Sequence, residues 1–281
     1  MCTIGAVFAD GGVYTFKQCD LTKPTKFYDP ETRQGKFPYK AFYRDGRPGI
    51  WAGINKAGVA FTAADAYTNA DYPATDDDVN ALFKVYELSV SSCITARDAA
   101  NILQNFYRNY VSAKGVKGFP APDIALHSDR GNIIFTEYTP ALYNQNPVRE
   151  LVVTRGFFTS TNHFRIQFDA VEYEKNHSTY LRLGRATLTL ENDQSKNGIY
   201  SLLTDGYYGK TELSICRFAQ YSGEYYTQAT ALLVNLPGLV ACEYQINNNP
   251  KDNPLKKCTS PLVGSLSKKP AGAGKSKRRT K

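Results

Sequence analysis

The sequence predicts an α+β fold built on antiparallel sheets. Short strand-like runs separated by turn signals fill the first quarter of the chain, helical runs occupy the middle, and strand-like runs return near the end. This order differs from the regular βαβ repeats of a parallel sheet. Neither a GxGxxG motif nor a Walker A motif occurs, so the sequence indicates no nucleotide cofactor.

The opening strands are expected at residues 2–9 and 12–18, because Asp10-Gly11-Gly12 between them is a typical hairpin turn. Glycines at both ends of residues 53–58 indicate a second tight turn, between strands at 50–52 and 58–63. The later strands are expected at residues 123–128, 132–138, 149–155, 229–235 and 238–244.

Three helices are expected between these strands. The run Asp76-Asp77-Asp78 indicates the start of the first, which continues to about Ser91, because acidic side chains favour the positive end of the helix dipole. Thr95 is the expected cap of the second, where apolar residues recur at helical spacing. The third is expected over residues 166–191.

Composition and charge limit the classes of function. Apolar residues make up 42% of the 281 residues, which is enough for a large core. No apolar run approaches the roughly 18–20 residues of a membrane span. The net charge of +8 comes almost entirely from residues 265–281, so the rest of the chain lacks a basic excess that would suggest a nucleic-acid-binding fold. We therefore expect one domain over residues 1–258 and a basic, disordered tail over 259–281, which either contacts an anionic partner or only adds solubility.

The cysteines and histidines do not suggest a metal site. The six cysteines are scattered without a CxxC pair and only three histidines are present, so no metal and no cofactor are expected. No basic and apolar leader precedes the second residue, so we expect a cytoplasmic protein whose thiols stay reduced.

Cys2 is the most informative residue. If Met1 is removed, as is usual before a small residue, Cys2 presents a thiol nucleophile together with a free α-amine that can act as its base. The reference pKa of such an amine, roughly 7.7–8, lies just below the roughly 8.5 of a thiol. Cys2 would equally serve as a small buried residue of the first strand, so the other motifs have to decide.

Several polar residues favour the catalytic interpretation when taken together. The first hairpin would return Lys17 and Asp20 to Cys2, where a cation favours the thiolate and a carboxylate can orient the amine. Asn55 in the second turn and Asn162 in the segment TNHF are suitable donors to an oxyanion. Each residue alone also fits an ordinary role in a turn or on the surface.

The remaining candidate residues would either orient other groups of the site or contact the substrate. Arg182 on the third helix would orient a carboxylate or bind a substrate acid, unless it lies on a solvated helix face. His163 is interpreted as packing or as a wall of the substrate site rather than as a base, and Phe164 follows it. Tyr67 belongs to a group of aromatic residues that would suit an apolar substrate group; the others are Phe27, Tyr28, Phe42 and Tyr43.

The order of these motifs resembles that of the N-terminal nucleophile (Ntn) hydrolases. The likeness is to their linear-amide cysteine branch, which includes conjugated bile acid hydrolases, penicillin V acylases and acyl-CoA:penicillin acyltransferases. It covers about residues 2–245. The motifs are the opening Met-Cys-Thr, KxxD at 17–20, GxNxxG at 53–58, TNHF at 161–164 and SxxxR at 178–182.

The resemblance implies an αββα sandwich of two mostly antiparallel sheets between helical layers. It also implies that Cys2 is the nucleophile with its own amine as the base, that Asp20 holds this amine, and that Asn55 and Asn162 contribute to the oxyanion hole. Arg182 would support the site. The family commonly has Arg where this chain has Lys17, which keeps the charge but loses the planar fork.

The implied reaction is hydrolysis of a linear amide, such as an N-acyl amino acid or a related N-acyl metabolite, through an acyl-enzyme. Two alternatives stay open. The same site would transfer the acyl group to an amine, or a catalytically idle member of the fold would act as a binding protein. We expect a small-molecule N-acyl amide as the partner, no membrane partner, and a homo-oligomer.

Overall fold

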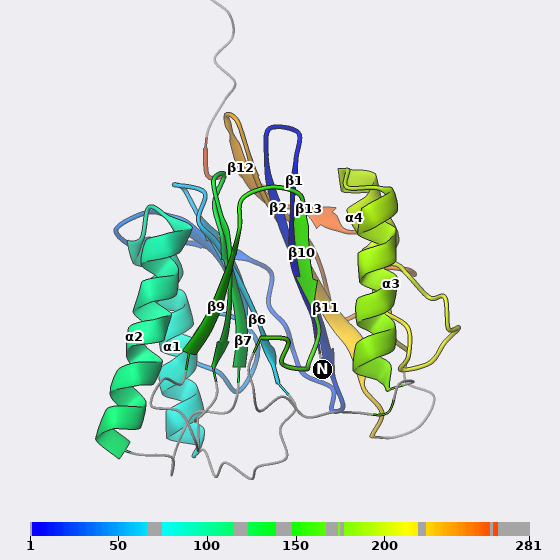
Figure 1. The fold of residues 1–281 in the computed structure, drawn as a ribbon, viewed down its shortest axis with the longest axis horizontal. Coiled ribbons are helices and arrows are strands. Elements are labelled where there is room, and N and C mark those ends of the chain that lie inside the picture. The colour runs from blue at the N-terminus through cyan, green and yellow to red at the C-terminus, as the bar shows by residue number, and fades with distance from the viewer. Residues whose placement is uncertain are drawn as a thin grey trace, which may run out of the picture.

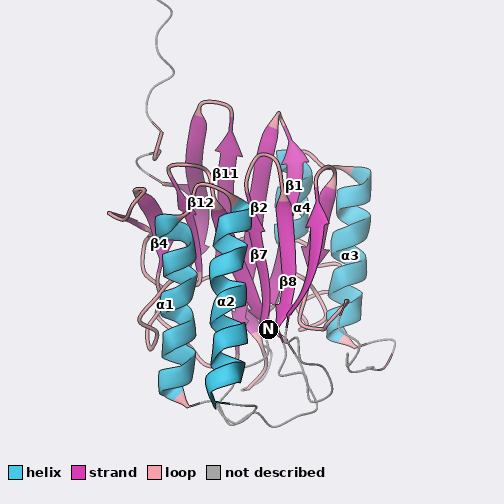
Figure 2. Ribbon diagram, turned by 60° about the vertical axis from the view of Figure 1, so that its left-hand side comes forward, coloured by secondary structure: helices cyan, strands magenta, loops and turns pink. Residues whose placement is uncertain are grey.

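Two antiparallel sheets pack face to face between two layers of helices (Figure 1). The computed structural model describes residues 2–66, 75–114, 123–138, 148–166, 174, 177–218, 223–258 and 261–263. Helices α1 (Asp76–Ser92) and α2 (Ala96–Lys114) cover one sheet, and α3 (Ser178–Asn192) and α4 (Lys196–Leu203) cover the other (Figure 2). The expected αββα sandwich is confirmed.

The six-stranded sheet contains the start of the chain at its centre. Its strand order is β10-β1-β2-β11-β12-β13, and all its pairings are antiparallel. Strands β1, β2 and β11 are buried on both faces, because the second sheet covers one face and α3 and α4 cover the other. The strands are β1 (Cys2–Ala9), β2 (Gly12–Leu21), β10 (Phe157–Ser160), β11 (Tyr226–Leu236), β12 (Leu239–Ile246) and β13 (Lys256–Lys257).

The seven-stranded sheet follows the chain order from β3 to β9. Its middle strands are buried between α1 and α2 on one side and the six-stranded sheet on the other. The strands are β3 (Glu31–Arg33), β4 (Tyr39–Phe42), β5 (Ala52–Asn55), β6 (Ala60–Asp65), β7 (Asp123–Ser128), β8 (Ile133–Tyr138) and β9 (Val148–Val153).

The first hairpin forms as its turn sequence predicts. Asp10 and Gly11 have positive φ angles of 53° and 73°, which give the left-handed turn that matches the twist of two paired strands. The register therefore pairs Ala9 with Gly12 and carries on to Cys2 opposite Cys19. This ladder fixes which residues of β2 lie beside Cys2.

The helices at 76 and 96 are confirmed, but the predicted start of the third helix at residue 166 is wrong. This helix begins at Ser178, because His177 has extended backbone angles and its side chain accepts the N–H of Thr179. Residues 165 and 166 form a bend, and residues 167–173 and 175–176 lie outside the described part of the chain.

A disulfide joins Cys242 in β12 to Cys258, with a Cα–Cα distance of 5.5 Å. This corrects the expectation that all six thiols stay reduced. The free cysteines of the described chain are Cys2, Cys19, Cys93 and Cys216, and all of these are buried. None of the helices in the described ranges is long and apolar enough to cross a membrane.

Candidate active site

Cys2 begins β1, at the end of the sandwich opposite the Asp10-Gly11 turn. It pairs directly with Cys19 on β2, and Lys17 lies two residues before Cys19 on the same face of the strand. This face is turned toward the second sheet, where Cys2, Lys17 and Cys19 line one narrow cleft with Asp65 at the end of β6. The hairpin thus brings Lys17 to Cys2, as the sequence predicts.

The surroundings of Cys2 favour its thiolate. A hydrogen bond from the Cys19 thiol lowers the pKa of Cys2, and the charge of Lys17 lowers this pKa further, while burial and the carboxylate of Asp65 act in the opposite direction. The same contact and burial raise the pKa of Cys19. Cys2 is therefore the ionised member of the pair and Cys19 is its proton-bearing neighbour.

Lys17 is held rigidly although its side chain is buried. Its Nζ donates to the carbonyl oxygen of Ala63 at 2.5 Å and lies 5.7 Å from the centre of the Trp51 ring. A carbonyl dipole and an aromatic face both compensate a buried cation without removing its charge. Lys17 therefore stays available as a positive charge beside Cys2.

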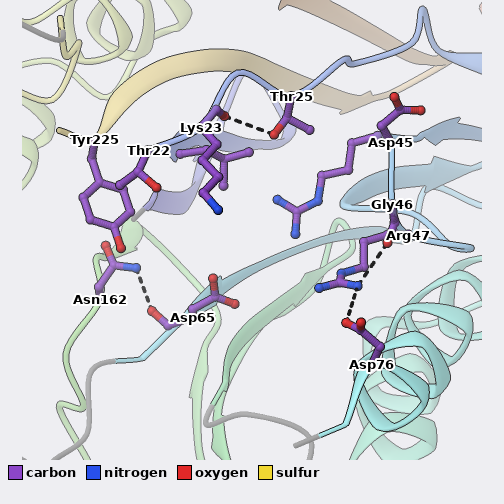
Figure 3. Close-up of a pocket in the computed structure, with 12 residues that line it drawn as sticks. Thr22, Lys23, Thr25, Asp45, Gly46, Arg47, Asp65, Asp76, Asn162 and Tyr225 are labelled. Atoms are coloured by element: carbon purple, nitrogen blue, oxygen red, sulfur yellow. Dashed lines mark hydrogen bonds and ion pairs between the residues drawn. The ribbon is translucent and has the colours of Figure 1, made fainter. Parts of the chain in front are cut away.

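Asn162 holds the backbone nitrogen of Cys2. Its Oδ1 accepts hydrogen bonds from Cys2 N at 2.8 Å and from Arg182 Nη2 at 2.9 Å. Its Nδ2 donates to the carbonyl oxygen of Asp65 at 2.6 Å (Figure 3). Because an amide nitrogen has two N–H groups, one donor of Asn162 remains after this bond.

Arg182 lies at the site and not on a solvated helix face. It is fully buried, and its Nη1 donates to Cys2 O at 2.7 Å and to Thr3 Oγ1 at 3.0 Å. Together with the bond to Asn162, these contacts clamp the start of β1 between α3 and the TNHF segment. The clamp fixes both the position of the Cys2 nitrogen and the direction of the strand.

Asp20 joins the same network from the opposite face of β2. Its carboxylate accepts from Thr227 Oγ1 at 2.8 Å and forms a buried ion pair with Arg217 at 3.7 Å. Arg217 and Arg182 both donate to Ser178 Oγ. The network connects Asp20 to Cys2 through two buried guanidinium groups. Arg217 is a site residue that the sequence analysis did not assign.

Asn55 does not lie at this site, which corrects the prediction that it contributes to the oxyanion hole. Its Nδ2 donates to the carbonyl oxygens of Val90 and Cys93 at 2.7 Å each, and its Oδ1 accepts from Val59 N. The turn that follows contacts Asn235, which pairs with Val13 near the far end of the first hairpin. Asn55 therefore stabilises a turn at the end of the sandwich away from Cys2.

The predicted substrate wall is also different. His163 is buried, with Nδ1 bonded to Thr161 and Thr179, and its ring packs on Tyr180. Phe164 belongs to the core between the sheets. Neither is among the described residues that line the two cavities below, so these contacts support a packing role, and their part in substrate binding stays a prediction. Tyr67 lies outside the described residues.

Two neighbouring spaces lie near this end of β1, and Cys2 lines the smaller one. The narrow cleft, of about 20 Å³, has room for about one water molecule and is lined by Cys2, Lys17, Cys19 and Arg44 among others. A wide cavity of about 630 Å³ shares Leu21, Arg44 and Asp65 with it. Asn162 and Tyr225 form one wall of the wide cavity, and charged side chains form the opposite wall (Figure 3). Among the described residues, Tyr225 is the aromatic one that lines the wide cavity, whereas Trp51, Phe83 and Tyr86 line the narrow cleft.

Comparison with known proteins identifies the fold. No family model matches the chain, and no curated protein matches its sequence. A structure of a conjugated bile acid hydrolase variant from Clostridium perfringens is similar with a TM-score of 0.56 and 12% identity, over 94% of this chain and 94% of that chain.

Two other solved structures have the same architecture. Penicillin V acylase from Agrobacterium tumefaciens matches with a TM-score of 0.52 and 12% identity, over 88% of this chain and 83% of that chain. An N-acylethanolamine-hydrolyzing acid amidase ortholog from Caenorhabditis elegans matches with a TM-score of 0.50 and 12% identity, over 83% of this chain and 92% of that chain. The sandwich is thus the fold that these three solved structures share with this chain.

Proposed function

We propose that this chain is an amidohydrolase that cleaves a linear amide with Cys2 as its nucleophile. One observation carries the proposal. The Cys2 nitrogen is fixed at 2.8 Å from Asn162 Oδ1, while the thiol of the same residue has a lowered pKa and faces the narrow cleft. Removal of Met1 would turn this nitrogen into a free amine at a fixed position. A nucleophile and its base would then sit on one residue.

The reaction follows from these positions. The Cys2 thiolate attacks the amide carbon, and the carbonyl oxygen becomes an oxyanion. The α-ammonium group of Cys2 then protonates the leaving amine, which breaks the C–N bond and leaves a thioester. The neutral amine next takes a proton from water, and the resulting hydroxide equivalent attacks the thioester carbon, which breaks the C–S bond, releases the acid and restores the thiolate beside the α-ammonium group.

Two donors are available for the oxyanion. The second N–H of the Asn162 amide is one, since the first is used by Asp65 O. The Tyr225 hydroxyl is the other, because Tyr225 lines the same cavity as Asn162. Burial and the negative charges of Asp65 and Cys2 raise the pKa of Tyr225, so its hydroxyl keeps its proton at neutral pH. Donors of this kind contribute about 3 kcal/mol each to the transition state.

We propose an N-acyl amino acid or a related N-acyl metabolite as the substrate. The wide cavity supports this because charged groups of both signs are among its described lining residues. The cytoplasmic location and the contact of the basic tail with an anionic partner stay predictions. The Cys242–Cys258 disulfide is more typical of an oxidising compartment.

The first test is the intact mass of the protein before and after treatment with a thiol-directed electrophile, with Cys2→Ala in parallel. We expect loss of Met1 and a single adduct that disappears in Cys2→Ala. A panel of N-acyl amides then measures turnover, which Cys2→Ala should abolish. Retention of Met1, or a first adduct that persists in Cys2→Ala, would remove the base or the nucleophile and contradict the proposal.

A further inference from the structure

Arg44 is a half-buried cation that has no charged partner among the described residues. It lies in the turn between β4 and β5 and lines both the narrow cleft with Cys2 and the wide cavity above it. Within the described part of the chain, its guanidinium group forms no hydrogen bond and no ion pair, and contacts the ring of Phe83 at 5.2 Å. A guanidinium group removed from bulk water is normally paired, because desolvation of an unpaired charge costs free energy.

The backbone around Arg44 is fixed. Arg44 forms a β-bridge with Phe27, Asp45 N donates to Lys26 O at 2.9 Å, and Tyr28 N donates to Tyr43 O at 3.2 Å. The base of the side chain is therefore held by backbone hydrogen bonds on both sides, and its far end packs on an aromatic ring. Such a side chain loses little additional freedom when it binds a ligand.

Some of the other charged groups that line the wide cavity already have partners. Arg47 is paired with Asp76 at 3.3 Å, and the Asp45 carboxylate accepts a hydrogen bond from the Tyr28 hydroxyl. Lys23 lines the same cavity and adds a second cation without a carboxylate partner among the described residues. Arg44 and Lys23 thus supply positive charge on one side.

Asp65 supplies the opposite sign beside Cys2. Its carboxylate raises the pKa of Cys2 and shares the narrow cleft with it. An anionic group on a substrate would be repelled by Asp65 and attracted by Arg44. An anionic group would therefore bind at the guanidinium of Arg44 rather than at the carboxylate of Asp65.

We infer that Arg44, assisted by Lys23, binds a carboxylate of the substrate and so selects N-acyl amino acids over neutral N-acyl amides. The planar guanidinium fork matches the two oxygens of a carboxylate. This inference rests on the proposed amide-cleaving site at Cys2, since that site places the scissile bond next to the cavity that Arg44 lines. Arg44 acts here as a specificity residue and takes no part in bond cleavage.

The test uses matched ligand pairs, N-acylglycines and the corresponding N-acylglycinamides with short, medium and phenylacetyl acyl groups. Binding is measured by titration calorimetry on the Cys2→Ala protein, where no turnover interferes. We expect the acid of at least one pair to bind more tightly than its amide. Arg44→Gln in the Cys2→Ala background should weaken binding of the acid by roughly 10- to 100-fold and leave the amide unchanged, as loss of a hydrogen-bonded charge pair predicts.

Two control variants separate this role from a general change of charge or stability. Arg47→Gln removes the same charge from the same cavity, but from a side chain already paired with Asp76, so it should leave the preference for the acid unchanged. Arg44→Lys keeps the charge and loses the fork, so it should retain part of the preference. Melting temperatures of all variants confirm that they fold.

The outcomes separate the inference from the proposed function. Equal binding of both members of every pair, or no binding of either, overturns the role of Arg44, and so does an equal effect of Arg47→Gln. Turnover by the protein with intact Cys2 is measured independently on the same pairs. Turnover of the acid and the amide at equal rates would support the proposed amidohydrolase activity and contradict the role of Arg44. Selective binding of the acid without turnover would contradict the proposed function alone.

Discussion

The Cys19 thiol lies directly across the β1–β2 ladder from Cys2 and donates a hydrogen bond to its sulfur. This contact is the largest single cause of the lowered pKa of Cys2. A second buried cysteine thus tunes the first through a pairing that the hairpin register determines.

Replacement of Cys19 should therefore change the pH dependence of Cys2. In Cys19→Ala, the donor to the thiolate is absent, so the pKa of Cys2 rises and the thiol reacts more slowly at neutral pH. The measurement is the rate of alkylation by iodoacetamide as a function of pH, followed by intact mass. The inflection should move to higher pH.

Cys19→Ser is the matched control for this prediction, because a serine hydroxyl still donates a hydrogen bond. Its inflection should lie closer to that of the unmodified protein than the inflection of Cys19→Ala does. If both variants titrate like the parent, the hydrogen bond has no effect on Cys2.

The sequence was sufficient to place Lys17 and Asn162 beside Cys2, but not Asn55. The turn at Asp10-Gly11 fixes the ladder, and the ladder alone returns Lys17 to the nucleophile. For Asn55 the tight turn was also recognised, but a turn motif defines only local geometry. Which end of the sandwich the turn occupies depends on packing between the sheets, and this packing places it beside Asn235.

Asn162 is predicted to have two separable roles. Asn162→Ala removes the acceptor of Cys2 N and one acceptor of Arg182 Nη2, so the free energy of unfolding should fall by about 1–3 kcal/mol per buried hydrogen bond lost. Asn162→Asp keeps an acceptor for Arg182 but has no donor for the oxyanion. It also loses the bond from Asn162 Nδ2 to Asp65 O, so it should be less stable than the parent but more stable than Asn162→Ala, and it should lose turnover.

Urea denaturation and initial rates on one amide substrate measure these two effects. The pair of variants is informative because stability and turnover should separate only in Asn162→Asp. Turnover by Asn162→Asp at the rate of the parent would exclude Asn162 as a donor to the oxyanion.

The buried pair of Asp20 and Arg217 should be important for stability. Both side chains are fully buried, so Asp20→Asn removes a buried negative charge that faces the guanidinium of Arg217, which should lower the free energy of unfolding by about 3–5 kcal/mol. Asp205→Asn is the control, since Asp205 pairs at 2.6 Å with Arg185, whose side chain is 24% exposed. Water can solvate the guanidinium of Arg185 when Asp205 is replaced, so Asp205→Asn should lower the free energy of unfolding less than Asp20→Asn does. Denaturation midpoints compare the two, and equal losses would argue against a structural role for the buried pair.

This network also shows why the sequence analysis missed Arg217. Asp20 and Arg217 are far apart in the chain, and their contact depends on the segment before β11 crossing the face of β2. No local motif encodes such a contact. The same holds for Arg44, whose position in the cavity is fixed by a β-bridge with Phe27 rather than by a recognisable pattern.

Tyr225→Phe tests the second oxyanion donor. The substitution removes one hydroxyl from the wall of the wide cavity and keeps the ring on which the guanidinium of Arg217 lies, at 5.9 Å. Loss of a donor of this kind typically lowers the turnover rate by roughly 10²–10³-fold. Because a donor to an oxyanion acts in the transition state, we expect kcat to fall with KM nearly unchanged.

The control is Tyr207→Phe, which removes a hydroxyl from a tyrosine that is 67% exposed and so measures the general effect of such a substitution. A rise in KM at constant kcat would instead assign Tyr225 to substrate binding.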